Sequence, residues 1–122
     1  MSRAALARTW RIPVPVTRWI AVCRVDDIVP NSGVCALAGE RQIAVFRLDD
    51  DRIYAIDNHD PYSKANVLSR GIVGDVQGEV VVASPVYKQH FSLASGLCIE
   101  DPAVCVPVFP VRVDAEVIWV EA

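Results

Sequence analysis

The stretch that decides the fold runs from Tyr54 to Phe91 and reads YAIDNHDPYSKANVLSRGIVGDVQGEVVVASPVYKQHF. It contains two proline turns, Asp60-Pro61-Tyr62 and Ser84-Pro85-Val86-Tyr87. Each turn follows a run typical of a β-strand, Arg52 to Asp57 in the first case and Glu79 to Ala83 in the second. The stretch therefore predicts two strands that each end in a protruding loop.

An apolar plug follows each turn, Val67-Leu68 behind the first loop and Phe91 behind the second. Moving apolar side chains of this size out of water lowers the free energy of the folded chain. Between Ser63 and Ser69 the sequence has room for one short turn of helix at most.

The rest of the chain favours the same class of fold. Its 122 residues fit one domain, 52% of them are apolar, and eight are proline. Val and Ile dominate short apolar pieces, which favours strands over helices. No apolar run approaches the roughly 20 residues that a membrane helix needs. The prediction is an all-β domain, a small antiparallel β-sandwich or barrel with two protruding loops.

Turn-forming residues between the apolar runs set the strand boundaries. The other expected strands span residues 18–24, 34–37, 41–48, 89–93, 105–113 and 117–121. Pro107 and Pro110 place the run 105–113 at a sheet edge, because proline lacks the donor that an inner strand needs. The acidic run 49–51 is predicted to be an exposed turn, because it lacks the alternating ligand spacing of a calcium loop.

Residues 1–17 differ from the rest in charge. They carry Arg3, Arg8 and Arg11 and no acid, and we predict a flexible basic tail in front of a domain at residues 18–122. That domain has 9 basic and 15 acidic groups, a net charge of −6, so no nucleic-acid partner is expected. The tail lacks the continuous apolar segment of a secretion signal, which predicts a cytoplasmic protein with no membrane partner.

The four cysteines, Cys23, Cys35, Cys98 and Cys105, contain no Cys-x-x-Cys pair of the kind that binds zinc or performs redox chemistry. In a cytoplasmic protein they are expected to stay reduced. We predict that they serve as small buried or half-buried apolar residues.

The two loops resemble those of the Rieske iron–sulfur domain, in which Cys-x-His and Cys-Pro-x-His hold one two-iron two-sulfur cluster. The second Rieske form, Cys-Pro-x-His-x-x-x-Phe, aligns with residues 84–91 without a gap. The resemblance assigns the four ligand positions to Asp60, Tyr62, Ser84 and Tyr87. Because a Rieske cluster needs two thiolates and two imidazoles, this chain is expected to lack one.

Longer strings resemble the small subunit of the assimilatory, NAD(P)H-dependent nitrite reductase. They are Val67-Leu68-Ser69-Arg70-Gly71, Ala83-Ser84-Pro85 with Lys88-Gln89, and GLCIED at 96–101. The resemblance covers roughly residues 18–121 and implies a cluster-free, Rieske-like accessory subunit. It also implies a large partner subunit that carries FAD, siroheme and an iron–sulfur cluster and reduces nitrite to ammonium.

Two alternatives stay open at the level of the sequence. The first is a Rieske-type ferredoxin that carries its own two-iron two-sulfur cluster for electron transfer. The second is a stand-alone binding domain unrelated to nitrogen metabolism. The missing ligands disfavour the ferredoxin, and the long family-like strings disfavour the unrelated domain.

No residue of the chain is expected to be catalytic or to bind a metal. His59 and His90 flank the loops and, with Asp60, offer the two histidines and the carboxylate of a mononuclear iron site. Neither histidine, however, falls on a Rieske ligand position. The chain has no Gly-x-Ser-x-Gly elbow and no glycine-rich phosphate loop between a strand and a helix.

The loop tips are expected to bind the large subunit, because tyrosine and arginine are enriched at interface hot spots. The candidate residues are Pro61, Tyr62, Arg70, Pro85, Tyr87, Lys88, Gln89 and His90. A second interpretation is that the two tyrosines fill the space of the absent cluster. The two interpretations are compatible if one tyrosine points inward and the other outward.

Overall fold

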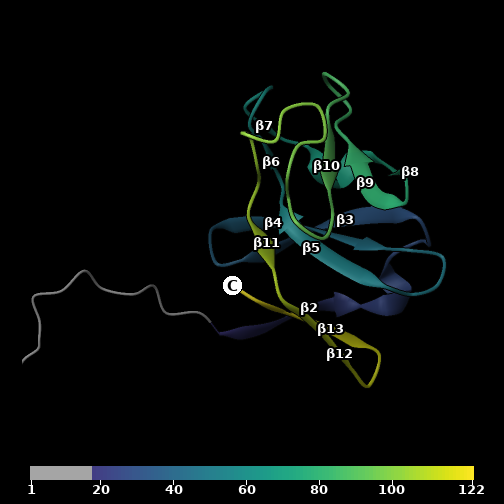
Figure 1. The fold of residues 1–122 in the computed structure, drawn as a ribbon. Coiled ribbons are helices and arrows are strands. Elements are labelled where there is room, and N and C mark those ends of the chain that lie inside the picture. The colour runs from purple at the N-terminus through teal and green to yellow at the C-terminus, as the bar shows by residue number, and fades with distance from the viewer. Residues whose placement is uncertain (1–17) are drawn as a thin grey trace, which may run out of the picture.

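The computed structural model describes residues 18–122, and the prediction of a tail at 1–17 lies outside this part of the chain. The described residues form four small antiparallel sheets, which confirms the all-β prediction, but no sheet closes into a barrel. Figure 1 shows two sheets at the base and two above them, with both loops projecting from the upper end.

The base consists of a four-stranded and a three-stranded sheet. The first has the order β11-β5-β4-β3 and the second the order β12-β13-β2. Their strands are β2 (Trp19–Arg24), β3 (Ser32–Ala38), β4 (Arg41–Arg47), β5 (Ile53–Asp57), β11 (Val108–Phe109), β12 (Val111–Asp114) and β13 (Val117–Glu121). A single turn of 3-10 helix, η1 (Val25–Asp27), follows β2.

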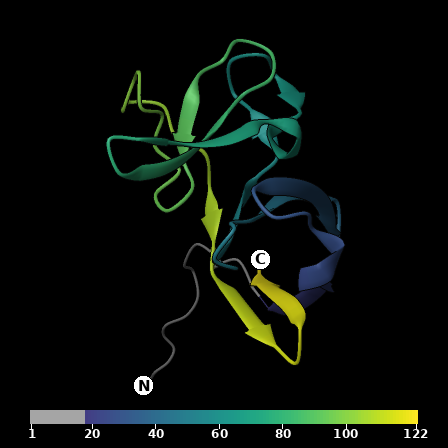
Figure 2. The same ribbon diagram turned by 90° about the vertical axis from the view of Figure 1, so that its right-hand side faces the viewer.

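The upper part carries the loops. Its three-stranded sheet has the order β10-β9-β8, and β6 pairs with β7 in a separate two-stranded sheet. The elements are β6 (His59–Asp60), β7 (Ala65–Asn66), the 3-10 turn η2 (Leu68–Arg70), β8 (Ile72–Val76), β9 (Glu79–Ala83) and β10 (His90–Ser92). Seen from the side, the upper part and the base form two lobes that β5 and β11 connect (Figure 2).

The central strand β4 contains an uninterrupted apolar run because it is buried on both faces. Ile43 and Val45 point into a core against β2, β3 and β13, whereas Ala44 and Phe46 point into a second core under the loops. Side chains of a strand alternate between faces, so a strand that is buried on both faces needs apolar residues at every position. All four of these side chains are fully buried.

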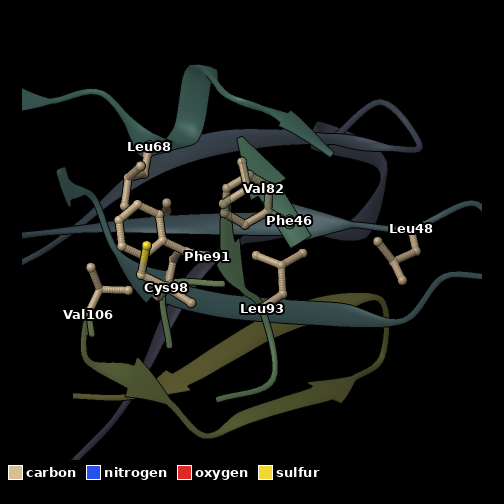
Figure 3. Packing of buried hydrophobic residues seen from close by; sticks show 10 residues of the cluster. Phe46, Leu48, Leu68, Val82, Phe91, Leu93, Cys98 and Val106 are labelled. Carbon is tan, nitrogen blue, oxygen red and sulfur yellow. The ribbon is translucent and has the colours of Figure 1, made fainter. Parts of the chain in front are cut away.

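The core under the loops joins the base to the upper part. Figure 3 shows Phe91 between Leu68 and Cys98, with Phe46 beside Val82. Leu68 and Phe91 are both fully buried, so the two plugs hold the loops against this core.

Two local expectations about the fold are wrong, and one strand was missed. The run 105–113 is not one strand: it divides at Pro110 into β11, which pairs with β5, and β12, which pairs with β13. The strand β8 was not anticipated, although it pairs with β9 through a tight turn at Gln77 and Gly78. Both turn residues have positive φ, 52° and 88°, as a two-residue hairpin requires.

The second wrong expectation concerns the cysteines. All four are free thiols, but Cys35 and Cys105 are exposed and only Cys98 is fully buried. Cys35 lies on β3, the outermost strand of its sheet, where its exposed thiol neighbours the side chains of Gln42 and Asn58. In the described part of the chain, no helix is long and apolar enough to cross a membrane.

Candidate functional site: two loops joined by a buried carboxylate

The first loop is organised by Asn58, at the end of β5. Its side-chain amide donates to the carbonyl of Asn66 (3.1 Å) and to Gln42 Oε1 (3.1 Å). Its side-chain oxygen accepts from the main-chain N–H of Ser69 at 2.7 Å. Asn58 is buried, and these bonds hold the two ends of the loop together. A buried amide of this kind is costly unless it is satisfied, so its partners fix the course of the chain.

Asp60 lies inside this loop and is also fully buried. One carboxylate oxygen accepts from the main-chain N–H of Tyr62 at 2.9 Å, and the other accepts from the hydroxyl of Ser63 at 2.9 Å. The main-chain carbonyl of Asp60 accepts from the N–H of Lys64 at 2.8 Å. The residue therefore closes its own turn with both side chain and backbone.

The second loop connects β9 to β10 and is closed at Ser84. Its main-chain N–H donates to the carbonyl of Gln89 (2.9 Å), and its carbonyl accepts from the N–H of Lys88 (3.1 Å). Ser84 is fully buried, and Lys88 has a left-handed φ of 69°. The residues between them, Pro85 to Tyr87, are exposed.

One hydrogen bond joins the two loops. The Ser84 hydroxyl donates to Asp60 Oδ2 at 2.6 Å, in a buried position. These are two of the four positions that the Rieske resemblance assigns to cluster ligands, one from each loop. A charge-assisted hydrogen bond is short and strong. Here it links the loops at the place where a cluster would link them.

The side chain of Asp60 favours its ionised form although it is buried. Burial raises its pKa, but the hydrogen bonds from Ser84, the Tyr62 N–H and Ser63 outweigh burial, so the pKa of Asp60 lies below its usual value. The donors are therefore matched to an ionised side chain.

The bases of the two loops are also in close contact. A Cβ atom on Gly71 would lie 2.4 Å from the carbonyl oxygen of Ala83 and 2.5 Å from the Val82 side chain. Any side chain would push the loops apart, which gives a physical reason for the glycine that ends the Leu-Ser-Arg-Gly string.

The two tyrosines point in opposite directions. The ring of Tyr62 packs 6.2 Å from that of Phe91, and its hydroxyl donates to Cys98 Sγ at 3.6 Å. This hydrogen bond, burial and nearby negative charges raise the pKa of Tyr62 to about 12. Tyr87, in contrast, is 60% exposed at the tip of the second loop. Tyr62 thus fills space under the loops and Tyr87 faces solvent.

Each histidine is paired within its own neighbourhood. His59 Nδ1 lies 3.0 Å from Asn66 Oδ1, and His90 Nδ1 lies 2.6 Å from Glu100 Oε2. Burial raises the pKa of Glu100, but its contacts with His90 outweigh burial and lower it. Within residues 18–122, no three His, Cys, Asp or Glu side chains gather as metal ligands would.

Comparison with known proteins decides the family. The Rieske-like [2Fe-2S] domain family matches residues 18–121. The chain is 48% identical over 99 residues to the nitrite reductase (NADH) small subunit of Salmonella typhimurium, covering 80% of this chain and 92% of that protein. The chain belongs to the family of nitrite reductase small subunits. This confirms the resemblance inferred from the loop and GLCIED strings.

Two further relatives of this small-subunit family are informative. A crystal structure described as an NADH-dependent nitrite reductase small subunit from Mycobacterium tuberculosis superposes with a TM-score of 0.83 at 44% identity, covering 88% of this chain and 97% of that one. The nitrite reductase [NAD(P)H] large subunit of Klebsiella oxytoca is 45% identical over 107 residues. That match covers 88% of this chain but 11% of the Klebsiella protein.

The residues of this small subunit do not fit the cluster that the family description names. A Rieske cluster takes two thiolates and two neutral imidazoles, whereas the aligned positions offer one carboxylate and three hydroxyls. Two of those groups, on Asp60 and Ser84, already bond to each other, and Tyr62 donates to Cys98.

The predicted partner-binding residues divide into two groups. Arg70, Pro85, Tyr87 and Lys88 are exposed, whereas Pro61, Tyr62, Gln89 and His90 are partly covered. Ile72, which was not predicted, is 73% exposed and pairs with Ala83 at the base of the second loop. Asn58 was also missed, although a polar residue directly after a buried strand is a recognisable signal for a loop clamp.

Proposed function

We propose that this chain is the small, accessory subunit of a cytoplasmic NAD(P)H-dependent nitrite reductase, that it holds no iron–sulfur cluster, and that its loop tips bind the large subunit. The large subunit would supply the FAD, siroheme and iron–sulfur groups that carry electrons to nitrite. In this assignment the small subunit contributes surface and shape, and the chemistry takes place in its partner.

The hydrogen bond between Ser84 and Asp60 is the observation that carries the proposal. In a Rieske protein the two loops are held together by the cluster that they share. Here they are held by a buried side-chain bond that needs no metal. The loop pair keeps its shape while its tips, with Tyr87 and Lys88, stay open to another surface.

The Klebsiella large subunit supports the choice of partner. A domain similar to this chain forms part of that polypeptide. A domain found fused to a protein in one organism is a natural candidate for a separate subunit of the corresponding protein in another.

Reconstitution is the direct test. The purified chain alone should not oxidise NADH or NADPH and should not reduce nitrite. It should bind the purified large subunit and co-elute with it on a sizing column. Turnover by the chain alone, or failure to bind, would refute the assignment.

The purified chain is expected to be colourless. The measurement is a visible spectrum with iron and acid-labile sulfide analysis after anaerobic purification, because a Rieske cluster contains two of each atom. A chain with stoichiometric iron and sulfide would instead be a Rieske-type ferredoxin, the alternative that carries its own cluster.

Reversing the charge of Lys88 is expected to weaken binding to the large subunit. Its ammonium group is exposed and contacts only the Pro85 carbonyl, at 3.4 Å, among the described residues. An acidic partner residue would pair with it, so Lys88→Glu should cost about 1–3 kcal/mol of binding free energy if the pair is buried and less at a rim. Calorimetry at two salt concentrations measures the effect.

A matched control uses Arg24→Glu, which changes the net charge equally on an exposed residue of β2, in the base. Binding by this variant should resemble the wild type, and both variants should melt like it. Equal affinity of Lys88→Glu and wild type at both salt concentrations would remove the second loop from the interface.

A further inference from the structure

The edge strand β8 carries main-chain hydrogen-bonding groups that no other strand of residues 18–122 uses. It is the outermost strand of the upper sheet, with β9 as its only neighbour in that sheet (Figure 1). Its first residue, Ile72, pairs with Ala83, and Ser84 begins the second loop directly after Ala83. The edge of β8 is therefore continuous with the loop surface that is proposed to bind the large subunit.

The register between β8 and β9 determines which main-chain groups point outward. Val76 and Glu79 flank the two-residue turn, so they form a hydrogen-bonded pair, and such pairs alternate with non-bonded ones along an antiparallel ladder. Every second residue of β8, counted back from Val76, therefore bonds to β9. The N–H and C=O groups of the other two residues, Val73 and Asp75, point away from β9.

Hydrogen bonds on the far side of β9 agree with this assignment. The carbonyl of Val80, the residue opposite Asp75, accepts from the N–H of Leu93 at 3.0 Å, on the side of β10. Two residues further, the N–H of Ser84 donates to the carbonyl of Gln89 on the same side. Among the described residues, none outside the sheet bonds to the main chain of Val73 or Asp75.

The edge of β8 lacks the features that usually keep sheet edges from pairing. Proteins protect such edges with lysine, proline or a β-bulge. β8 reads IVGDV and its register with β9 has no shift. Ile72 is 73% exposed, and a Cβ atom on Gly74 would meet nothing within 4 Å. The one charged side chain, Asp75, accepts from the N–H of Gly78 at 2.8 Å, so it is held at the turn.

A hollow of about 380 Å³ beside this edge indicates which side chain an added strand would bring. Val73 and Asp75 line it together with Asp49 from the turn that follows β4. The one cation in its wall, Arg52, is paired with Asp50 at 2.8 Å. The two carboxylates of the wall therefore favour a basic side chain in the hollow. A second copy of β8 has no such side chain to offer.

We propose that an extended segment of the large subunit pairs with the outer edge of β8, with an apolar side chain beside Ile72 and a basic side chain in the hollow at Asp49 and Asp75. The inference rests on the proposed function, because it specifies how the contact with the large subunit continues from the loop tips. In such strand addition, main-chain hydrogen bonds supply affinity and alternate side chains supply specificity. The outward groups of Val73 and Asp75 each gain a partner.

Residue-resolved amide hydrogen exchange tests the proposal. The isotopically labelled subunit is measured alone and after exchange in its complex with the purified large subunit. In the free subunit the amides of Val73 and Asp75 should exchange faster than those of Gly74 and Val76, because only the latter two bond to β9. In the complex, exchange at Val73 and Asp75 should slow by at least about tenfold. Equal exchange at these two amides in both states would overturn the proposal.

Two pairs of variants separate the strand contact from other effects. Asp75→Pro removes one outward N–H, whereas Asp75→Ala loses the same carboxylate but keeps the N–H. The proline variant should bind the large subunit about tenfold more weakly than the alanine variant, because a carbonyl of the partner loses its donor. Ile72→Lys should also weaken binding, since lysine protects an edge from pairing. Its control is Leu37→Lys, at a 67% exposed position on β3, an edge strand of the base, which should bind like the wild type.

The outcomes distinguish this inference from the proposed function. Wild-type affinity of both Ile72→Lys and Asp75→Pro for the large subunit would overturn strand addition and leave the accessory role intact. A wild-type subunit that does not bind would overturn both. A subunit that sediments as a dimer on its own and becomes monomeric in Asp75→Pro would assign the edge to a second copy, which also overturns the proposal. Melting curves of all four variants establish that the differences arise in folded protein.

Discussion

Replacing Asp60 by alanine is expected to lower the free energy of unfolding by about 2–4 kcal/mol, because the change leaves one buried donor and two partly buried donors without an acceptor. These donors are the hydroxyls of Ser84 and Ser63 and the N–H of Tyr62. Ser84→Ala removes only the bond between the loops and should cost less. Urea unfolding of both variants and of the double variant would give the coupling between the two residues.

The stability that Asp60 contributes is expected to fall as the pH falls. The pKa of Asp60 is lower in the folded protein than its usual value, so its contribution to stability is present above about pH 4 and is lost as the pH falls through the folded value. The stability difference between wild type and Asp60→Ala should therefore narrow from about pH 7 to about pH 3. A difference that stays constant over this range, or a cost near zero at neutral pH, would contradict the role given to the carboxylate.

The sequence predicted β2 to β5 and β13 of the base because these strands follow simple physical rules. The alternating faces of β4 and the hairpin turns at 38–40 and 49–51 place apolar residues where two cores need them. The strand β8 escaped because Gly74 and Asp75 interrupt its apolar pattern and Ile72 is exposed. The Gln77-Gly78 turn was the available signal. The division at Pro110 depends on which strand each half pairs with, and a local pattern does not contain that information.

The sequence did not predict the chemistry that joins the two loops. Aligning the loops with a Rieske pattern places Asp60 and Ser84 at corresponding points of the two loops, but it does not predict that they bond to each other. Their hydrogen bond depends on a distance between residues 24 positions apart, which no spacing rule supplies. The contact between Tyr62 and Cys98, 36 positions apart, was missed for the same reason.

Replacing Phe91 by alanine is expected to have the largest effect, a loss of about 3–5 kcal/mol of unfolding free energy. The side chain is fully buried under both loops, and its ring packs against that of Tyr62. Its residue pairs with Val82 on β9 and forms a bridge with Cys98. Small domains are typically stable by only about 5–15 kcal/mol, so the variant would be close to unfolded.

Tyr87→Ala provides the comparison, since it removes a ring of similar size from the exposed tip of the loop that leads into β10. With 60% of Tyr87 in solvent, its removal should change stability by no more than about 0.5 kcal/mol. Any loss of affinity for the large subunit by Tyr87→Ala would then report on the surface alone. Phe91→Ala, studied by urea unfolding at low temperature, should lose stability and affinity together, because both loops rest on that ring. A Phe91→Ala protein with near wild-type stability would show that the apolar plug does not anchor the loops. The effect of Tyr87→Ala would then have to be compared with that of another variant at a buried position.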